Sequence, residues 1–118
     1  MQREVTLADT AAAWDPSLPP AASTPFVLGL AELACHAILA PDLKDDELSV
    51  GTGATIEHLG ASRVGATLVA SARTTVREGR RATFAVEVHD GARLVARVEH
   101  GRAIVARARI LAALEEAA

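Results

Sequence analysis

Apolar positions divide this chain into one helical stretch and several strand-like stretches. In residues 24–40, TPFVLGLAELACHAILA, they lie on every side of a helix rather than along one stripe. A helix that is apolar all round is enclosed by the rest of its fold, so we expect a buried helix there. Thr24 is a favourable N-cap, and Pro25 suits the first helical position because nothing there needs its missing N–H.

Beyond the helix and an acidic link, apolar and polar positions alternate, which is typical of strands with one buried face. Gly79 marks one turn between them, and Asp90-Gly91 suits a two-residue hairpin with a type I′ turn. Strands are expected at residues 49–60, 65–76, 82–89 and 92–105. Within them, Gly51 and Gly53 indicate a bulge or a close approach of the backbone, and a bulge is also expected at Gly101.

The two ends of the chain are less regular. Residues 2–8 alternate and predict an edge strand, whereas residues 11–23 hold three prolines and predict a loop. Trp14 in this loop is expected to pin it to the body of the protein or, alternatively, to line the mouth of a pocket. The tail, residues 106–118, has helical composition and predicts a short helix.

This order of elements predicts a single α+β domain over residues 1–118. One face of an antiparallel sheet needs a cover, and the long apolar helix supplies it. The expected architecture is therefore a hot-dog fold, an antiparallel sheet wrapped around one central helix. Long edge strands need covering, and the core has few aromatic side chains, two Phe and one Trp, so a homodimer is expected.

Composition excludes several classes of function. A net charge of −3 argues against bulk nucleic-acid binding. The single cysteine, Cys35, and an N-terminus without an apolar signal region favour a cytoplasmic protein without disulfides. Glu32 and His36 interrupt the longest apolar run, which we therefore read as too polar for a membrane span.

Three polar residues stand out against apolar surroundings: Thr24, Glu32 and His58. A lone buried carboxylate such as Glu32 costs several kcal/mol unless it is paired or protonated. Thr24 and Glu32 lie on similar sides of the helix, about 12 Å apart along its axis. Each residue also has an ordinary interpretation: Thr24 as a cap, Glu32 as an acid bonded to backbone or to His36, and His58 as a strand-end residue.

The segments TPFVLGLAELACHAILAPDL and SVGTGATIEHL resemble the fluoroacetyl-CoA thioesterase family of the hot-dog superfamily. That family has a Thr followed by a Glu within a buried GLxExA helix, then a Gly-Thr pair that opens the next strand, then a His. Here these positions are Thr24, Glu32, Gly51-Thr52 and His58, without a gap. The HDG turn at 89–91 and EHGRAIV at 99–105 also match, so the resemblance spans roughly residues 22–106.

The resemblance implies an acyl-CoA thioesterase with Thr24, Glu32 and His58 as the catalytic set. His58 would move protons, the helix N-terminus with the N–H groups of Thr24 and Phe26 would stabilise the oxyanion, and the nucleophile is Thr24, Glu32 or water. The other expected substrate-binding residues are Phe26, Gly51, Trp14 and Arg63.

The family pattern also implies that the acyl-CoA binds between two subunits and that no metal or redox cofactor takes part. In place of the phenylalanines that gate the pocket of the fluoroacetate-specific member, this chain has WDPSLPP, so a preference for fluoroacetyl-CoA is not expected. Three arginines have two interpretations: they contact the CoA phosphates, or they are ordinary solvated charges at strand ends. They are Arg63, Arg80 and Arg81.

Two non-enzymatic alternatives remain: a module that binds acyl-CoA or a small acid without hydrolysing it, and a purely structural dimerisation domain. A hot-dog dehydratase or hydratase is a lesser rival, because its usual Asp/His pairing on the helix is absent.

Overall fold

The computed structural model describes residues 1–117. Along the chain it contains β1 (Gln2–Glu4), two short 3-10 helices η1 (Leu7–Asp9) and η2 (Ala11–Ala13), α1 (Thr24–Leu39), η3 (Ala40–Asp42), β2 (Glu47–His58), β3 (Thr67–Glu78), β4 (Arg81–Asp90), β5 (Arg93–Ala106) and α2 (Arg107–Ala117).

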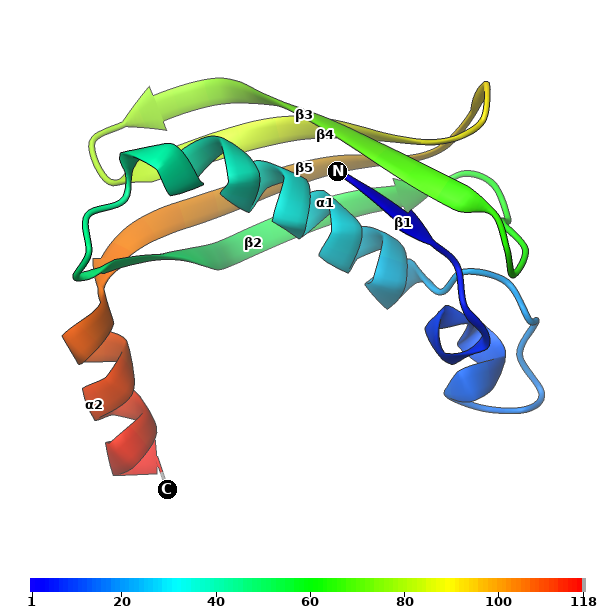
Figure 1. The fold of residues 1–118 in the computed structure, drawn as a ribbon, viewed down its shortest axis with the longest axis horizontal. Helices are drawn as coiled ribbons and strands as arrows, with labels where there is room; N and C mark the ends of the chain where they lie inside the picture. Colours follow the sequence, from blue (N-terminus) through cyan, green and yellow to red (C-terminus); the bar gives the residue numbers. More distant parts are fainter. Residues whose placement is uncertain (118) are drawn as a thin grey trace.

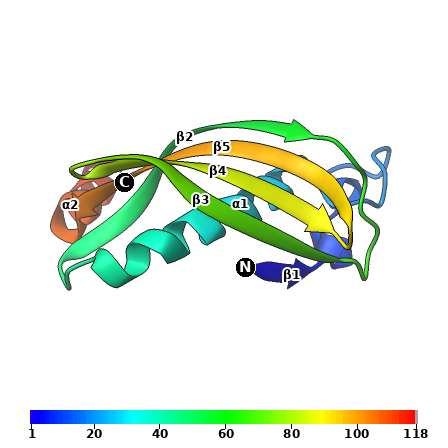
Figure 2. The same cartoon turned by 90° about the horizontal axis from the view of Figure 1, so that it is seen from above.

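The five strands form one antiparallel sheet in the order β1-β3-β4-β5-β2. The sheet curls over α1, which lies across its concave face (Figures 1 and 2). This confirms the predicted hot-dog fold. The first strand is shorter than predicted, because residues after Glu4 turn away and Leu7–Asp9 form η1.

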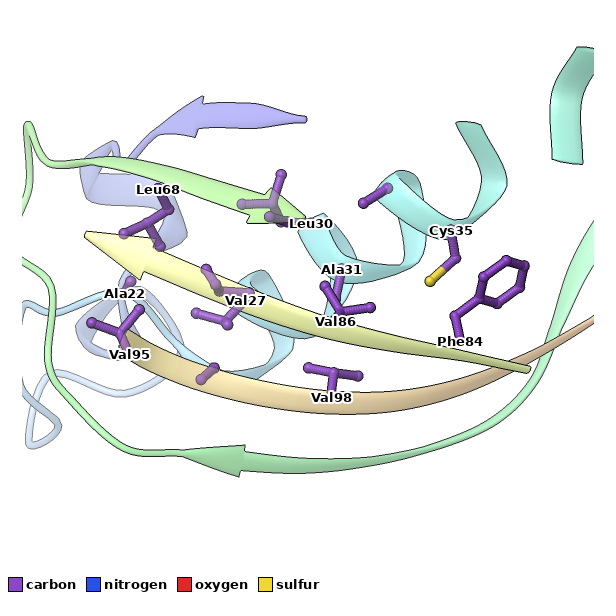
Figure 3. Close-up of a cluster of buried hydrophobic side chains, with 14 of the residues drawn as sticks. Ala22, Val27, Leu30, Ala31, Cys35, Leu68, Phe84, Val86, Val95 and Val98 are labelled. Atoms are coloured by element: carbon purple, nitrogen blue, oxygen red, sulfur yellow. The ribbon is translucent and has the colours of Figure 1, made fainter. Parts of the chain in front are cut away.

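The core lies between α1 and the sheet (Figure 3). Its largest side chain is Phe84 from β4, and most of the others are valine, leucine or alanine. From α1 come Val27, Leu30, Ala31, Ala34, Cys35 and Leu39, and from the central strands Leu68, Val86, Val88, Val95 and Val98.

The expectation of a fully enclosed helix is wrong for a single chain. Leu33 and Ile38 on the outer side of α1 are 42% and 38% exposed. By length and composition alone, Thr24–Asp42 is also apolar enough to cross a membrane, so the interruptions by polar residues are weaker than we expected. One side of this helix packs on the sheet, as in core helices, and the other is left open.

The start of α1 differs from the prediction by one residue, with a chemical consequence. Ser23 is the N-cap, and its Oγ accepts a hydrogen bond from the N–H of Phe26 at 3.2 Å. Thr24 is therefore the first helical residue rather than the cap. Its hydroxyl is free for another partner.

Both hairpin loops contain a glycine followed by a second residue, Gly79-Arg80 and Gly91-Ala92. A type I′ turn needs positive φ at both positions, but only the glycines have it, with φ of 58° and 60°. The predicted hairpin at Asp90-Gly91 is confirmed and its predicted turn type is wrong.

A bulge interrupts the pairing of β2 with β5. Gly51 pairs with Arg102 and Gly53 with Gly101, so Thr52 is the extra residue. The bulge predicted near Gly51 and Gly53 is confirmed, and the one predicted at Gly101 lies on the opposite strand instead. β2 is also an edge strand, and Gly51 through Thr55 are exposed.

Candidate active site

Thr24 and His58 meet where the N-terminus of α1 approaches the end of β2. The Oγ1 of Thr24 lies 2.8 Å from Nδ1 of His58, which is a hydrogen bond. These residues are 34 positions apart in the sequence and converge because α1 begins and β2 ends at the same side of the molecule. The Nε2 of His58 is buried and has no hydrogen-bond partner among the described residues.

This pair lies in a pocket of about 330 Å³. The segment before α1 forms one wall of it, through residues such as Ala11 and Pro19, and the chain after β2 forms the other, through Leu59, Gly60 and Ala61. A second hollow, next to the first, shares Ala21 and Ala61 with it and is lined by Arg63.

Few backbone donors remain at the N-terminus of α1. Pro25 has no N–H, the N–H of Phe26 donates to Ser23 Oγ, and the N–H of Val27 donates to the Ser23 carbonyl at 3.0 Å. Within residues 1–117, the N–H of Thr24 is the first-turn donor without a hydrogen bond in the structure. The expectation that Phe26 offers a free N–H is therefore wrong.

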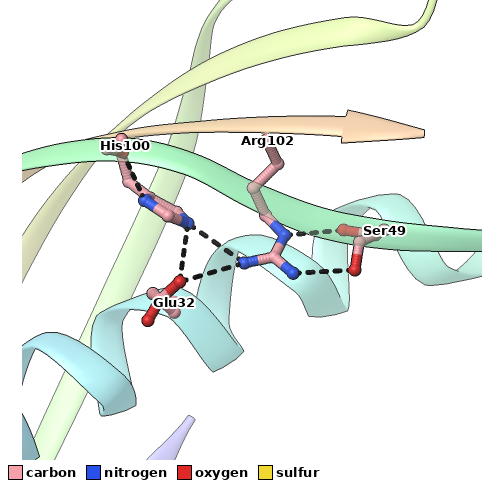
Figure 4. Close-up of polar contacts among 5 residues, drawn as sticks. Glu32, Ser49, His100 and Arg102 are labelled. Carbon is pink, nitrogen blue, oxygen red and sulfur yellow. Dashed lines mark hydrogen bonds and ion pairs between the residues drawn. The ribbon is translucent and has the colours of Figure 1, made fainter. Parts of the chain in front are cut away.

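Glu32 lies two turns along α1 in a second polar cluster (Figure 4). Its Oε1 is 3.5 Å from Nη1 of Arg102 and 3.5 Å from Nε2 of His100, both on β5. The side chain of Arg102 is 9% exposed, and its guanidinium donates to the Oγ and the carbonyl of Ser49 at 2.6 Å and 2.9 Å. The Glu32 side chain is 40% exposed, so the buried acid expected from the sequence is half open to solvent.

The hydrogen bonds of His100 determine its tautomer. Its Nδ1 lies 2.9 Å from the carbonyl of Gly53, so Nδ1 must carry the proton. Its Nε2 then accepts from Nη1 of Arg102 at 3.0 Å. His100 is therefore neutral in this arrangement, and the cation that faces Glu32 is Arg102.

Gly51 allows the Glu32 carboxylate to approach the sheet. A Cβ at this position would lie 2.6 Å from Oε1 of Glu32 and 3.2 Å from Cε1 of His100. The close approach predicted for Gly51 is confirmed. It places this glycine beside the candidate acid.

The three candidate catalytic residues therefore form two groups in one chain. Thr24 and His58 are joined directly, and Glu32 belongs to the cluster with His100 and Arg102. Among residues 1–117, no hydrogen bond or ion pair connects Glu32 with either Thr24 or His58.

Of the other residues predicted to bind substrate, only some lie near the Thr24–His58 pocket. Phe26 packs against the core, and Trp14 is 73% exposed and lines neither hollow, so it does not pin its loop to the body. Arg63 is exposed beside the Thr24–His58 pocket. Arg80 pairs with Glu47 at 3.1 Å at the opposite end of β2, far along the strand from His58.

Sequence reasoning missed His100, Arg102 and Ser49. Alternation along β5 was the available signal. His100 and Arg102 follow Val98 at every second position, so all three side chains lie on the same, buried face of the strand. Two polar residues at inward positions of a core strand call for a partner such as Glu32.

Two other features bear on the chemistry. Cys35 is buried, and burial raises the pKa of its thiol to about 11, which keeps it protonated and unreactive. Among residues 1–117, no group of three or more His, Cys, Asp or Glu side chains is placed to hold a metal ion.

The comparisons with known proteins agree on one family. The model of the family described as fluoroacetyl-CoA-specific thioesterase matches residues 5–108. The fluoroacetyl-CoA thioesterase of Streptantibioticus cattleyicolor is 36% identical over 83 residues, which are 70% of this chain and 60% of that protein. The match thus spans less than two thirds of that relative's length.

Solved structures agree with this result. A variant of the fluoroacetyl-CoA-specific thioesterase in complex with fluoroacetate and CoA is 29% identical, with a TM-score of 0.90 over 98% of this chain and 95% of the other. A thioesterase superfamily member from Thermus thermophilus, 24% identical, has a TM-score of 0.89 over 98% of this chain and 86% of its own, and shows the shared fold.

Proposed function

This chain belongs to the fluoroacetyl-CoA-specific thioesterase family, and we propose that it hydrolyses the thioester of a short or compact acyl-CoA to the free acid and CoA. The observation that carries the proposal is the hydrogen bond between Thr24 and His58 inside a pocket of about 330 Å³. A hydroxyl held by an imidazole is the arrangement that nucleophilic or general-base catalysis requires.

In the proposed reaction, Nδ1 of His58 accepts a proton from the attacking oxygen, which belongs to Thr24 or to a water held in its place. The oxygen adds to the thioester carbonyl, and the N–H of Thr24 donates to the oxyanion at the positive end of α1. As the C–S bond breaks, His58 returns its proton to the departing CoA sulfur. If Thr24 is the nucleophile, the same His58 then activates a water that releases the acid.

The place of Glu32 in this reaction follows from a proposed homodimer. β2 is an edge strand that pairs with β5 on one side only, and the outer face of α1 leaves Leu33 and Ile38 exposed. An edge of this length needs a cover, and a second β2 pairing antiparallel with it supplies one. The two sheets then become continuous and both helices lie on the same side.

Such pairing brings Glu32 toward the partner's catalytic pair. A two-fold axis between Gly53 and Thr55, in the exposed part of β2, sets the partner's His58 opposite about position 48 to position 52. These positions include Ser49 and Gly51, which contact Arg102 and approach Glu32. We propose that Glu32 of one subunit and the Thr24–His58 pair of the other serve the same thioester, with Glu32 orienting water or the imidazole.

The rest of the substrate has a route along the neighbouring hollow. That hollow continues from the Thr24–His58 pocket through Ala21 and Ala61 and is lined by Arg63. We propose that the pantetheine arm follows it and that Arg63 meets the CoA phosphates. Beyond the CoA of the substrate we propose no cofactor, and a cytoplasmic location.

The test is release of free thiol from a panel of acyl-CoAs by wild type, His58→Ala and Glu32→Gln. We expect wild type to be active on short acyl groups and both variants to lose at least about 100-fold in kcat. Wild type that binds acyl-CoA but hydrolyses none of the panel would instead support the non-catalytic module. Wild type that does neither would support a structural domain.

A further inference from the structure

His100 is a buried titratable side chain that the proposed reaction does not use. It lies on the inner face of β5, next to Glu32 of α1, and is 3% exposed (Figure 4). Three polar groups contact its ring: the carbonyl of Gly53, Nη1 of Arg102 and the carboxylate of Glu32. A group with these partners can act on the candidate acid without touching the substrate.

Few other groups face His100 from the neighbouring elements. On β4 the opposite residue is Phe84, which is apolar. On α1, Cys35 lies close enough to the cluster for Arg102 and Glu32 to affect the pKa of its thiol, which burial keeps protonated. In the described part of the chain, Glu32 and Arg102 are therefore the charged groups in contact with the imidazole.

The contacts at Nε2 show which protonation state of His100 the structure contains. Nε2 lies 3.0 Å from Nη1 of Arg102 and 3.5 Å from Oε1 of Glu32. An Nε2 that carried a proton would be attracted to the carboxylate and repelled by the guanidinium, which is the opposite of these distances. Neutral His100 therefore accepts from Arg102 and donates nothing to Glu32.

Glu32 is held loosely as a result. Both of its contacts in the cluster are 3.5 Å long, whereas a hydrogen bond between a cationic nitrogen and a carboxylate is typically about 2.7–2.9 Å. Arg102 makes its shorter bonds to Ser49 and His100, at 2.6 Å and 3.0 Å. The carboxylate is therefore free to bind a substrate or a water outside its own cluster.

Protonation of His100 would reverse this arrangement. The imidazole would take up a proton from solvent at Nε2, because Nδ1 already carries the proton that it donates to the Gly53 carbonyl. Nε2 would then be a donor, so Arg102 would lose an acceptor and Glu32 would gain a cationic partner. A short ion pair between Glu32 and His100 would hold the carboxylate inside the cluster.

We propose that His100 is a positioning residue for Glu32: the neutral imidazole leaves the carboxylate free to act, and the protonated imidazole withdraws it. The proposal rests on the role proposed above for Glu32 in hydrolysis and adds a proton-dependent control of that residue. Turnover then requires two neutral imidazoles, His58 as the base and His100 as the group that releases Glu32.

The pH dependence of thiol release distinguishes this role from a purely structural one. Two imidazoles that must both be neutral give a wild-type kcat/KM that falls about 100-fold per pH unit at the acid end of the profile. In His100→Gln the amide oxygen can accept from Arg102 but cannot be protonated, so the fall should be about tenfold per unit. Equal slopes in wild type and His100→Gln overturn the proposal.

His89→Gln is the matched control for this substitution. His89 lies near the end of β4, where it pairs with Leu94, and it belongs to neither polar cluster. This variant should keep the wild-type slope.

Nuclear magnetic resonance tests the same arrangement without the reaction. In the wild-type chain at pH 8, the nitrogen signals of His100 should show a proton at Nδ1 only. The guanidinium signals of Arg102 should change as His100 takes up its second proton, and in His100→Gln they should stay constant over the same pH range. An imidazole protonated at Nε2 at pH 8, or guanidinium signals that do not follow the protonation of His100, overturns the proposal.

The two measurements keep this result apart from the proposed activity. A chain inactive on every acyl-CoA that shows these changes in the signals of Arg102 would support the positioning of Glu32 by His100 and contradict the hydrolysis. An active chain without these changes would do the reverse.

Discussion

Gly51 provides the space that the carboxylate of Glu32 occupies. In Gly51→Ala the new methyl would lie 2.6 Å from Oε1, so the carboxylate must move. We expect kcat to fall by as much as about 100-fold, since a displacement near 1 Å in a catalytic group has that effect. The measurement is steady-state thiol release.

Gly53→Ala is the matched control, because a Cβ there meets nothing within 4 Å. It should retain most of the activity. Equal losses in the two variants would mean that the bulge, and not the room for Glu32, is what matters.

Substitution of Arg63 tests the proposed position of the CoA phosphates. Arg63→Gln should raise KM for acyl-CoA and leave kcat nearly unchanged, because its proposed contact is with phosphates that take no part in the reaction. A thioester of pantetheine, which lacks the terminal phosphates, should be hydrolysed equally by both proteins. A KM unchanged for acyl-CoA would contradict the proposed path.

Cys35 should resist thiol reagents in the folded protein. Burial raises the pKa of its thiol from 9.0 to about 11, with Arg102 lowering it and Glu32 raising it to smaller extents. Labelling by a thiol-reactive disulfide at pH 8 should be slow in buffer and fast in urea. Fast labelling of the native protein would show that α1 opens readily.

The same shift has a defined sign for stability. The folded pKa is the higher one, so the contribution is complete below pH 9 and is lost as pH rises from 9 to 11. By the usual conversion, the free energy of unfolding falls by about 2 to 3 kcal/mol over that range. Urea unfolding of Cys35→Ala should lack this part of the decline.

At the level of elements, the start of α1 separates stability from chemistry in adjacent residues. Ser23→Ala removes the cap and should lower the free energy of unfolding by about 1 kcal/mol. Thr24→Ala, at an exposed position, should cost under about 0.5 kcal/mol but remove most of the activity. Thermal unfolding and thiol release on both variants check the assignment. The reverse pattern would restore Thr24 as the cap.

The elements themselves were largely predictable from the sequence. Alternation and turn residues located β2 to β5 within a few residues, because each strand has one face on the core. The type I′ turn was wrong because the loop begins at Gly91 and not at Asp90, a difference of register that composition does not encode.

The candidate site was predictable only in part. Thr24, Glu32 and His58 were found through the family resemblance, and the Thr24–His58 contact joins residues distant in sequence. Ser23 as the cap and the cluster around Arg102 were missed, because both depend on how α1 is set against β2 and β5. The exposure of Trp14 also escaped prediction, since the pattern of residues in a loop does not determine whether its tryptophan packs inward or faces solvent.

At the scale of the whole molecule, a single chain leaves several surfaces uncovered and its candidate catalytic residues in two separate groups. The β2 edge, the outer face of α1, the segment 7–20 and α2 are all open, and Glu32 is not connected to the Thr24–His58 pair. The proposed two-fold homodimer would cover the β2 edge and bring Glu32 of one subunit near the partner's Thr24–His58 pair. The central claim is therefore that each active site draws Glu32 from one subunit and Thr24 with His58 from the other.

Complementation tests this claim most directly. Glu32→Gln and His58→Ala are prepared separately, each nearly inactive, then mixed and allowed to exchange subunits. Half of the dimers become mixed, and each mixed dimer regains one intact site, so activity should return to about one quarter of wild type. Mixtures that stay as inactive as the separate variants, although exchange is complete, would contradict the account.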